Sequence, residues 1–190
     1  MQLFQIAMAY KNKTICNPVT GQNITFLQTA KDTGGALLEM ESVYNSTSKE
    51  PAPHYHPAQE EDFTVLEGSL SVKLNGQLRI LHAGDTLHIS KNEVHAMWNH
   101  TGGKTVVNWK VRPALDTEVL LETGTGLAAD GKVNEKGMPP LLQSALIGNH
   151  FAPMYRLAKP PFAIQKILFS LLAPIAYLKG YRATYPKYLD

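Results

Sequence analysis

The sequence predicts a mainly β body, ending near residue 113, followed by a helical C-terminal part over residues 114–190. Two observations predict this class. Between residues 22 and 112, short runs of strand-forming residues alternate with turn residues, and no helical period extends over a convincing length. After Pro113, acidic helix starts and proline or glycine helix boundaries replace that pattern. A chain of 190 residues is long enough to bury a core without disulfides.

Eight strands are predicted in the body, at residues 23–28, 36–44, 62–66, 69–74, 77–81, 86–89, 94–99 and 105–111. This number of short strands is typical of a sandwich or a closed barrel. Asn75-Gly76 predicts a two-residue hairpin with positive φ, and Thr101-Gly102-Gly103 has similar turn residues before the last strand. We therefore expect the strands on either side of each turn to be antiparallel neighbours.

Three helices are predicted in the C-terminal part. The first begins at the acidic residues 116–118 and is expected to end near Gly124 to Gly126, and the second covers residues 141–147 before Gly148. The third covers residues 162–179, with proline before it and glycine after it. Pro174 is expected to kink or break this helix.

Composition narrows the classes of function. The 18 basic and 16 acidic residues leave a net charge of +2, which is too small to favour a nucleic-acid partner. Cys16 is the only cysteine, so an intramolecular disulfide and a Cys-rich metal site are excluded. Residues 1–9 lack a basic start and carry glutamine inside an apolar run, which is untypical of a signal peptide. We therefore expect a cytoplasmic protein.

Four side chains have the chemistry and the spacing of a metal centre. His54 and His56 are two residues apart, so on a strand both imidazoles point to the same face. Glu61 opens the strand that follows, and His95 begins another strand after a turn at Lys91-Asn92. Three neutral imidazoles and a carboxylate suit a divalent transition metal, which could be Fe, Mn, Co, Ni, Zn or Cu, and leave open positions for water or substrate.

At this point the sequence resembles the cupin superfamily. His54, His56, Glu61 and Gly68 match the spacing of one cupin motif, and Gly84, His95 and Asn99 match that of the other. The chain departs from the motifs where Lys49 or Glu50 replaces a leading glycine, and where Ser90 and Asn92 stand at usual proline and glycine positions. These are turn positions, and asparagine tolerates positive φ.

The resemblance covers residues 22–112 and implies a jelly-roll β-barrel, also called a double-stranded β-helix, with the metal at its centre. It further implies a bacterial single-domain protein, residues 1–113 being the barrel and residues 114–190 a helical extension packed on the barrel or on a partner subunit. A homodimer is implied in the same way. A cupin transcription factor is not favoured, because only about twenty residues precede the first predicted strand.

The side chains expected around the metal are apolar. Phe63, Val65, Met97 and Trp109 are candidates for the pocket lining, although each can equally be ordinary core. Such a lining favours a small apolar or aromatic ligand over a sugar nucleotide. The leading hypothesis is a metal-dependent, dioxygenase-like enzyme in which Glu61 both binds the metal and serves as a catalytic base. The alternative is a non-catalytic cupin that binds or senses a small ligand or a metal.

The C-terminal residues 150–190 carry six basic residues and one acidic residue. One hypothesis is that the apolar helix at residues 162–179 packs on the barrel or across a dimer. The other is that it lies in the interface of an anionic membrane, which makes the protein membrane-peripheral. A transmembrane span is not expected, because the uninterrupted apolar run is far shorter than about 20 residues.

Overall fold

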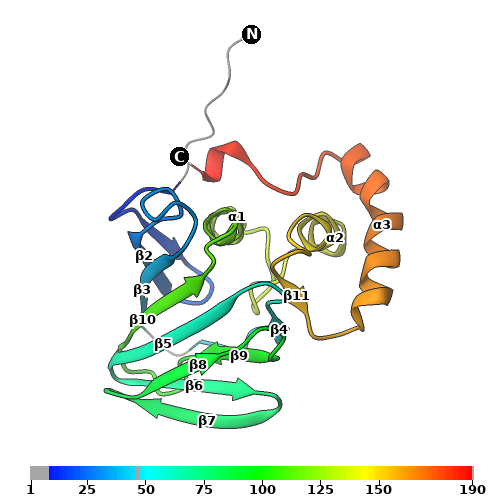
Figure 1. Ribbon diagram of the computed structural model, residues 1–190. Helices are drawn as coiled ribbons and strands as arrows, with labels where there is room; N and C mark the ends of the chain where they lie inside the picture. Colours follow the sequence, from blue (N-terminus) through cyan, green and yellow to red (C-terminus); the bar gives the residue numbers. More distant parts are fainter. Residues whose placement is uncertain (1–8, 46–47, 190) are drawn as a thin grey trace.

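Figure 1 shows the computed structural model, which describes residues 9–45 and 48–189. Along these residues the chain forms eleven strands, three α-helices and one 3-10 helix. The prediction of a mainly β body with C-terminal helices is confirmed. Residues 1–8, which include most of the segment that is untypical of a signal peptide, lie outside the described residues.

The strands form two antiparallel sheets. The first has the order β1-β2-β3-β10-β5-β8 and the second the order β11-β4-β9-β6-β7. The first contains β1 (Thr14–Asn17), β2 (Gln22–Gln28), β3 (Leu38–Tyr44), β5 (Glu60–Glu67), β8 (Thr86–Ile89) and β10 (Thr105–Arg112). The second contains β4 (His54–Tyr55), β6 (Ser69–Leu74), β7 (Gln77–His82), β9 (His95–Trp98) and β11 (Arg156–Leu157). All eight predicted strands are present, while β1, β4 and β11 were not predicted because strands this short carry little periodic signal.

The core lies between the sheets and is divided into two clusters of buried side chains. One cluster includes Phe26, Leu38 and Met40 near the barrel end that faces the helices, and the other contains Phe63 and Val65. Trp109 packs against both clusters. Burial alternates residue by residue along β3, as expected for a strand with one face on the core.

The two predicted turns have different outcomes. Asn75 and Gly76 have φ values of 49° and 84° and close the β6–β7 hairpin, as predicted. The prediction that Thr101-Gly102-Gly103 joins two paired strands is wrong, because β9 and β10 lie in different sheets. The chain instead crosses from one sheet to the other here, and Asn99 holds the crossing segment. Its side-chain oxygen accepts hydrogen bonds from the backbone N–H and the hydroxyl of Thr101, and its side-chain amide donates a hydrogen bond to the carbonyl of Gly103.

The helices are α1 (Thr117–Ala129), α2 (Leu141–His150) and α3 (Phe162–Leu178), followed by the 3-10 helix η1 (Pro186–Tyr188). The predicted ends of the first two helices are wrong, because α1 runs through Gly124 and Gly126 and α2 through Gly148. A Cβ atom on Gly126 would lie 2.2 Å from the Tyr188 ring, and one on Gly148 would lie 2.5 Å from the Phe169 ring. Two of these glycines therefore allow close packing inside helices rather than ending them.

The third helix is continuous through Pro174, so the prediction of a break there is wrong. Its predicted end is confirmed, since Gly180 has a φ of 84° just after the helix. Gly180 donates its N–H to the carbonyl of Tyr177, and Tyr181 donates to that of Ala176, which together form a Schellman motif. Within the described residues, no helix combines the length and the hydrophobicity needed to cross a bilayer.

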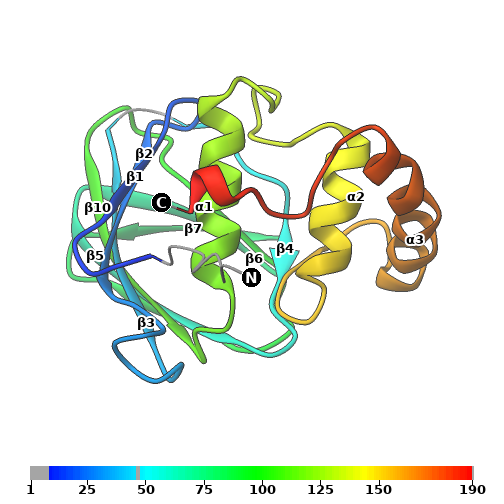
Figure 2. The same cartoon turned by 90° about the horizontal axis from the view of Figure 1, so that it is seen from above.

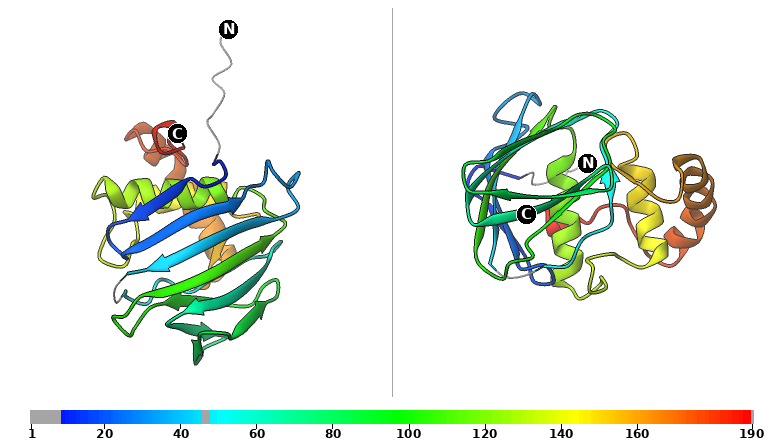
Figure 3. Two further views of the ribbon diagram at one scale, coloured as in Figure 1. Left: turned by 90° about the vertical axis from the view of Figure 1, so that its left-hand side faces the viewer. Right: turned by 90° about the horizontal axis from the view of Figure 1, so that it is seen from below.

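Helix α1 lies across the open end of the barrel (Figure 2), and α2 and α3 lie beyond it on one side. Glu118 on α1 accepts from the N–H of Ala30 at 2.6 Å, and Glu122 lies 2.7 Å from the ammonium group of Lys13. Strand β11 pairs with β4, so the C-terminal part adds a strand to the second sheet. The division at residue 113 stays a prediction, and in the structure the two parts share this sheet. Figure 3 shows the two sheets and the helices from the side and from below.

Candidate metal centre

Three imidazoles come together on the second sheet, just inside the barrel mouth. His54 lies on β4 and is paired in register with His95 on β9, while His56 follows β4. The His54 ring centroid lies 4.4 Å from that of His95 and 5.2 Å from that of His56. One nitrogen from each ring lies within 4.8 Å of the others, so the three histidines are placed to bind one metal ion.

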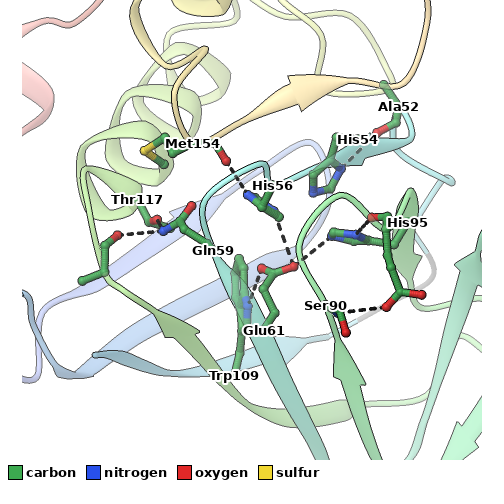
Figure 4. Close-up of polar contacts among 12 residues, drawn as sticks. Ala52, His54, His56, Gln59, Glu61, Ser90, His95, Trp109, Thr117 and Met154 are labelled. Carbon is green, nitrogen blue, oxygen red and sulfur yellow. Dashed lines mark hydrogen bonds and ion pairs between the residues drawn. The ribbon is translucent and has the colours of Figure 1, made fainter. Parts of the chain in front are cut away.

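Backbone carbonyls orient all three rings (Figure 4). In each histidine the Nδ1 atom faces a carbonyl oxygen, which can only accept, so in the neutral ring Nδ1 carries the proton and Nε2 keeps a free lone pair. This is the tautomer that binding a metal through Nε2 requires. Metal-bound histidines typically donate a hydrogen bond from the ring nitrogen that does not contact the metal, as Nδ1 does here. The carbonyls are those of Ala52 at 3.3 Å from His54, Met154 at 2.8 Å from His56 and Glu93 at 3.0 Å from His95.

Glu61 completes the group from the first sheet. Its side chain is almost fully buried, and its Oε2 atom lies 2.9 Å from Nε2 of His95 and 3.4 Å from Nε2 of His56. Its Oε1 atom accepts a hydrogen bond from the indole N–H of Trp109 at 3.0 Å. Burial alone would raise the pKa of Glu61, but His56, His95 and His54 outweigh burial and lower the pKa to about 2. Glu61 is therefore a carboxylate.

The imidazoles differ in their readiness to take up a proton. Burial, followed by the neighbouring His95 and His56, lowers the pKa of His54 to about 3, so its ring is neutral. Burial also acts to lower the pKa of His95, but the hydrogen bond and the charge of Glu61 outweigh it and raise that pKa. In the absence of a metal, the Glu61 carboxylate therefore favours the protonated form of His95.

The residues present fit a divalent transition metal. Nε2 of His56 is buried and has no hydrogen-bond partner among the described residues, and the buried Oε2 of Glu61 lies beside only the ring nitrogens of His56 and His95. Buried polar atoms are rarely left without a partner, and here both point at the space between the imidazoles (Figure 4). Three nitrogen donors and one carboxylate oxygen match the ligand preferences of Fe, Mn, Co, Ni, Zn and Cu. Nothing in this donor set selects one of these metals.

Two cavities border the histidines. The inner cavity, of about 150 Å³, lies inside the barrel and is bordered by His54, Glu61 and His95. The outer cavity, of about 290 Å³, lies between the barrel mouth and the helices and is bordered by His54 and His56. The outer cavity is lined mainly by apolar side chains, which include Ile24, Leu120, Leu121, Met138, Ile147, Leu157 and Phe169. The candidate metal centre therefore lies between a small cavity inside the barrel and a larger apolar chamber.

The predicted pocket residues occupy two kinds of position. Phe63, Met97 and Trp109 border the inner cavity, and Trp109 also borders the outer one. The rings of Phe63 and Trp109 are stacked with centroids 5.7 Å apart. Val65 lies on the same face of β5 and is almost fully buried within the core cluster.

Two residues of the site were not found from the sequence. Tyr155, just before β11, borders the outer cavity with its ring centroid 4.9 Å from that of His54. Gln59 is fully buried, and its amide donates to the carbonyls of Pro113 and Ala114 and to the hydroxyl of Thr117. Gln59 therefore ties the segment between His56 and Glu61 to the start of α1. No sequence motif marks either residue, because both act across elements that are distant in the chain.

A comparison with protein-family models finds a cupin domain within the chain. Residues 42–109 match the sequence model of the cupin domain. An RmlC-like cupin from Shewanella frigidimarina is 21% identical, with a TM-score of 0.47 over 58% of this chain and 93% of that chain. KdgF from Halomonas sp. is 18% identical, with a TM-score of 0.43 over 51% of this chain and 84% of that chain. A sugar phosphate isomerase of the cupin superfamily from Silicibacter pomeroyi is 17% identical, with a TM-score of 0.44 over 55% and 68%. No curated protein sequence matches this chain.

Proposed function

Residues 42–109 form a cupin domain, and from this premise we propose that the protein is a metal-dependent, dioxygenase-like enzyme acting on a small apolar or aromatic molecule. The observation that carries the proposal is the cluster of three histidine ring nitrogens, of which those of His54 and His56 belong to residues that border the mainly apolar outer cavity. A site of this kind brings an apolar molecule to a metal while excluding water.

His54, His56 and His95 would hold the metal through Nε2, and Glu61 would add Oε2 as a fourth ligand. A bound transition metal would supply Lewis acidity and, if it is redox-active, a way to activate dioxygen. Trp109 fixes the Glu61 carboxylate through its other oxygen, so the ligand atom stays aimed at the imidazoles.

Glu61 has a second role in this proposal. With its pKa lowered to about 2, it is ionised at neutral pH, and it would accept a proton from an acidic substrate hydroxyl that reaches past the histidines into the inner cavity. Its Oε2 atom faces the inner cavity, where it meets the imidazoles rather than bulk water. Replacement of Glu61 by glutamine would keep its shape and remove its basicity. If that variant retains metal and full activity, the role as base is wrong.

The substrate class follows from the lining of the outer cavity. Among the described residues that line it, Arg156 is the only lysine, arginine, aspartate or glutamate, and its guanidinium group lies over the Phe162 ring. No cluster of basic side chains lines the chamber among the described residues, as phosphate recognition would require. A molecule with an apolar or aromatic body therefore fits this cavity better than a sugar phosphate.

The first test is elemental analysis of protein purified without added metal. We expect about one transition-metal ion per chain, lost in His95→Asn and retained in His88→Asn. His88 is a suitable control, because it is exposed and bonded to Asp62 on the outside of the barrel. Absence of metal from the unmodified protein, together with no uptake from Fe²⁺, Mn²⁺, Ni²⁺, Co²⁺, Cu²⁺ or Zn²⁺, would overturn the proposal.

The second test separates catalysis from binding. Metal-free protein is loaded with each of the six metals in turn, and oxygen uptake is recorded with catechol and with a flavonol as probes. We expect uptake with one redox-active metal and none in His95→Asn. Saturable binding of a probe without oxygen uptake or conversion under any metal would favour the non-catalytic binding module instead.

A further inference from the structure

Helix α3 has one face buried against the rest of the protein and a second apolar face that the described residues leave uncovered. Gln165, Phe169 and Ala176 are its buried residues. The Phe169 ring packs on Gly148 of α2, which lets the two helices approach closely. This contact accounts for the buried face, but it does not account for the hydrophobicity of the remainder of the helix.

The uncovered face is a continuous row of aliphatic side chains, which we call the α3 stripe. Apart from one pair of adjacent residues, its members follow one another at intervals of three or four residues, so they lie along one side of the helix. Their exposed fractions range from 38% to 89%. The α3 stripe consists of Ile164, Ile167, Leu168, Leu171, Ile175 and Leu178. Contiguous exposed apolar surface of this kind marks an interaction site.

The position of α3 leaves this surface open to a flat partner. In Figures 1 and 2, α3 forms the outer edge of the molecule, with α2 between it and α1. The barrel lies on the other side of these helices, so a planar surface can approach the outer side of α3 before it meets either sheet. An occupant of this face therefore does not need to be concave.

The charge around the α3 stripe is of one sign. From residue 151 to residue 189 the chain contains six lysines and arginines and no acidic residue. Lys159 precedes the helix, Lys166 lies within it and Lys179 follows it, and none of the three has an ion-pair partner among the described residues. Half of Tyr177 is exposed near the end of the helix, and tyrosine is enriched where apolar and polar phases meet.

This charge distinguishes the two occupants that could cover the stripe. A second copy of the chain would bring the same basic residues face to face, which is unfavourable. An anionic lipid surface offers the opposite charge together with an apolar layer beneath it. We propose that α3 binds anionic membranes as an interfacial helix, with the α3 stripe among the acyl chains and the lysines at the level of the headgroups.

The test is co-sedimentation of the full chain with two kinds of vesicle. One kind is pure phosphatidylcholine, and in the other about a quarter of the lipid is phosphatidylglycerol. We expect binding to the anionic vesicles, weaker binding to the neutral ones, and release from the anionic vesicles at high salt. No binding to anionic vesicles would overturn the proposal.

Two variants and a matched control test the surface itself. Ile167→Gln/Leu171→Gln should reduce partitioning into anionic vesicles by roughly tenfold or more. Lys166→Glu/Lys179→Glu keeps the stripe and should also reduce partitioning. The control is Leu78→Gln/Ile80→Gln on β7, which removes two similarly exposed aliphatic side chains far from α3 and should leave partitioning unchanged. An equal loss of binding in the control would overturn the proposal.

The same proteins also test the alternative that the α3 stripe is covered by a second copy of the chain. Sedimentation velocity measures the oligomeric state of the unmodified chain and of Ile167→Gln/Leu171→Gln, and circular dichroism verifies that each is folded. Suppose that the unmodified chain is a dimer and does not bind vesicles, and that the stripe variant is a monomer. The stripe is then an interface between copies, and the membrane proposal is wrong. Metal content does not enter these measurements, so their outcome is independent of the proposed enzymatic function.

Discussion

Trp109 donates its indole N–H to Oε1 of Glu61 at 3.0 Å, which leaves Oε2 of the same carboxylate facing His56 and His95. The two residues lie on adjacent strands of the first sheet, with Trp109 paired in register with Phe63, two residues after Glu61. One side chain thus serves as core, as cavity wall and as the support of a candidate metal ligand.

Trp109→Phe should weaken metal binding, because it removes the hydrogen bond that orients Glu61. Loss of an outer hydrogen bond to a metal ligand typically lowers affinity by about 10- to 100-fold. The measurement is competition with a chromophoric chelator. Trp98→Phe is the control, because Trp98 is partly exposed on β9 and alternates to the opposite face from Met97. Similar affinities in both variants would show that the Trp109 hydrogen bond does not support the metal site.

Tyr155→Phe should weaken ligand binding and leave metal binding intact. The Tyr155 hydroxyl has no hydrogen-bond partner among the described residues, and burial raises its pKa to about 12, so it remains a donor at the edge of the outer cavity. Loss of one hydrogen bond to a bound ligand is worth about 1 kcal/mol, or roughly fivefold in affinity. Titration with whichever probe shows oxygen uptake or saturable binding provides the measurement, and exposed Tyr10→Phe is the control.

The stability of the metal-free protein should fall as the pH drops from about 6.5 to about 4.5. His54 has a pKa near 3 when folded and an ordinary value of 6.5 when unfolded, so in this window only the unfolded chain binds the proton. The stabilising contribution of neutral His54 is present above pH 6.5 and is lost below it, by up to about 1.4 kcal/mol per pH unit.

His95 and Glu61 act outside this window. The raised pKa of His95 gives a contribution that is complete below pH 6.5 and is lost as the pH rises through the folded value. The lowered pKa of Glu61 gives a contribution that is present above pH 4.5 and is lost as the pH falls toward 2. Urea unfolding with a chelator present measures the slope, which should become flatter in His54→Gln and stay unchanged in His88→Gln. An equal slope in all three proteins would contradict the assignment to His54.

The candidate metal centre was predictable from sequence because its residues follow short, regular spacings within two segments of the chain. His54 on β4 and His56 just after it share a face by the alternation of extended backbone, and a glutamate and a third histidine at strand starts follow the spacing of the cupin motifs. The support of the centre is not local. The carbonyl of Met154 orients His56 from 98 residues away, and β11 is too short to show a periodic pattern.

The same distinction explains the errors in the helices. Glycine was interpreted as a helix end, which is its commonest meaning when only neighbours in sequence are considered. A glycine inside a helix can instead make room for an aromatic ring from a residue elsewhere in the chain, as Gly126 does for Tyr188. Gly180 was interpreted correctly because the Schellman motif is made by its own neighbours.

Two glycines of α1 should therefore respond in opposite ways to alanine. Nothing lies within 4 Å of a Cβ atom on Gly124, so Gly124→Ala should stabilise the protein by up to about 1 kcal/mol through helix propensity. A Cβ atom on Gly126 would lie 2.2 Å from Cγ and 2.8 Å from Cβ of Tyr188, close to the backbone of η1. Gly126→Ala should destabilise the protein by about 1–3 kcal/mol, because η1 must move away from α1.

Urea unfolding of both variants measures this difference, and Gly126→Ala/Tyr188→Ala shows whether the ring is the cause. Removal of the ring should make the alanine at position 126 much less costly, a coupling that a double-mutant cycle detects. Tyr188 also donates to Asp130 at 2.7 Å, so Tyr188→Phe is needed to separate the loss of this hydrogen bond from the loss of the ring contact. Destabilisation by Gly124→Ala equal to that by Gly126→Ala would mean that backbone flexibility, and not the space for Tyr188, accounts for glycine in this helix.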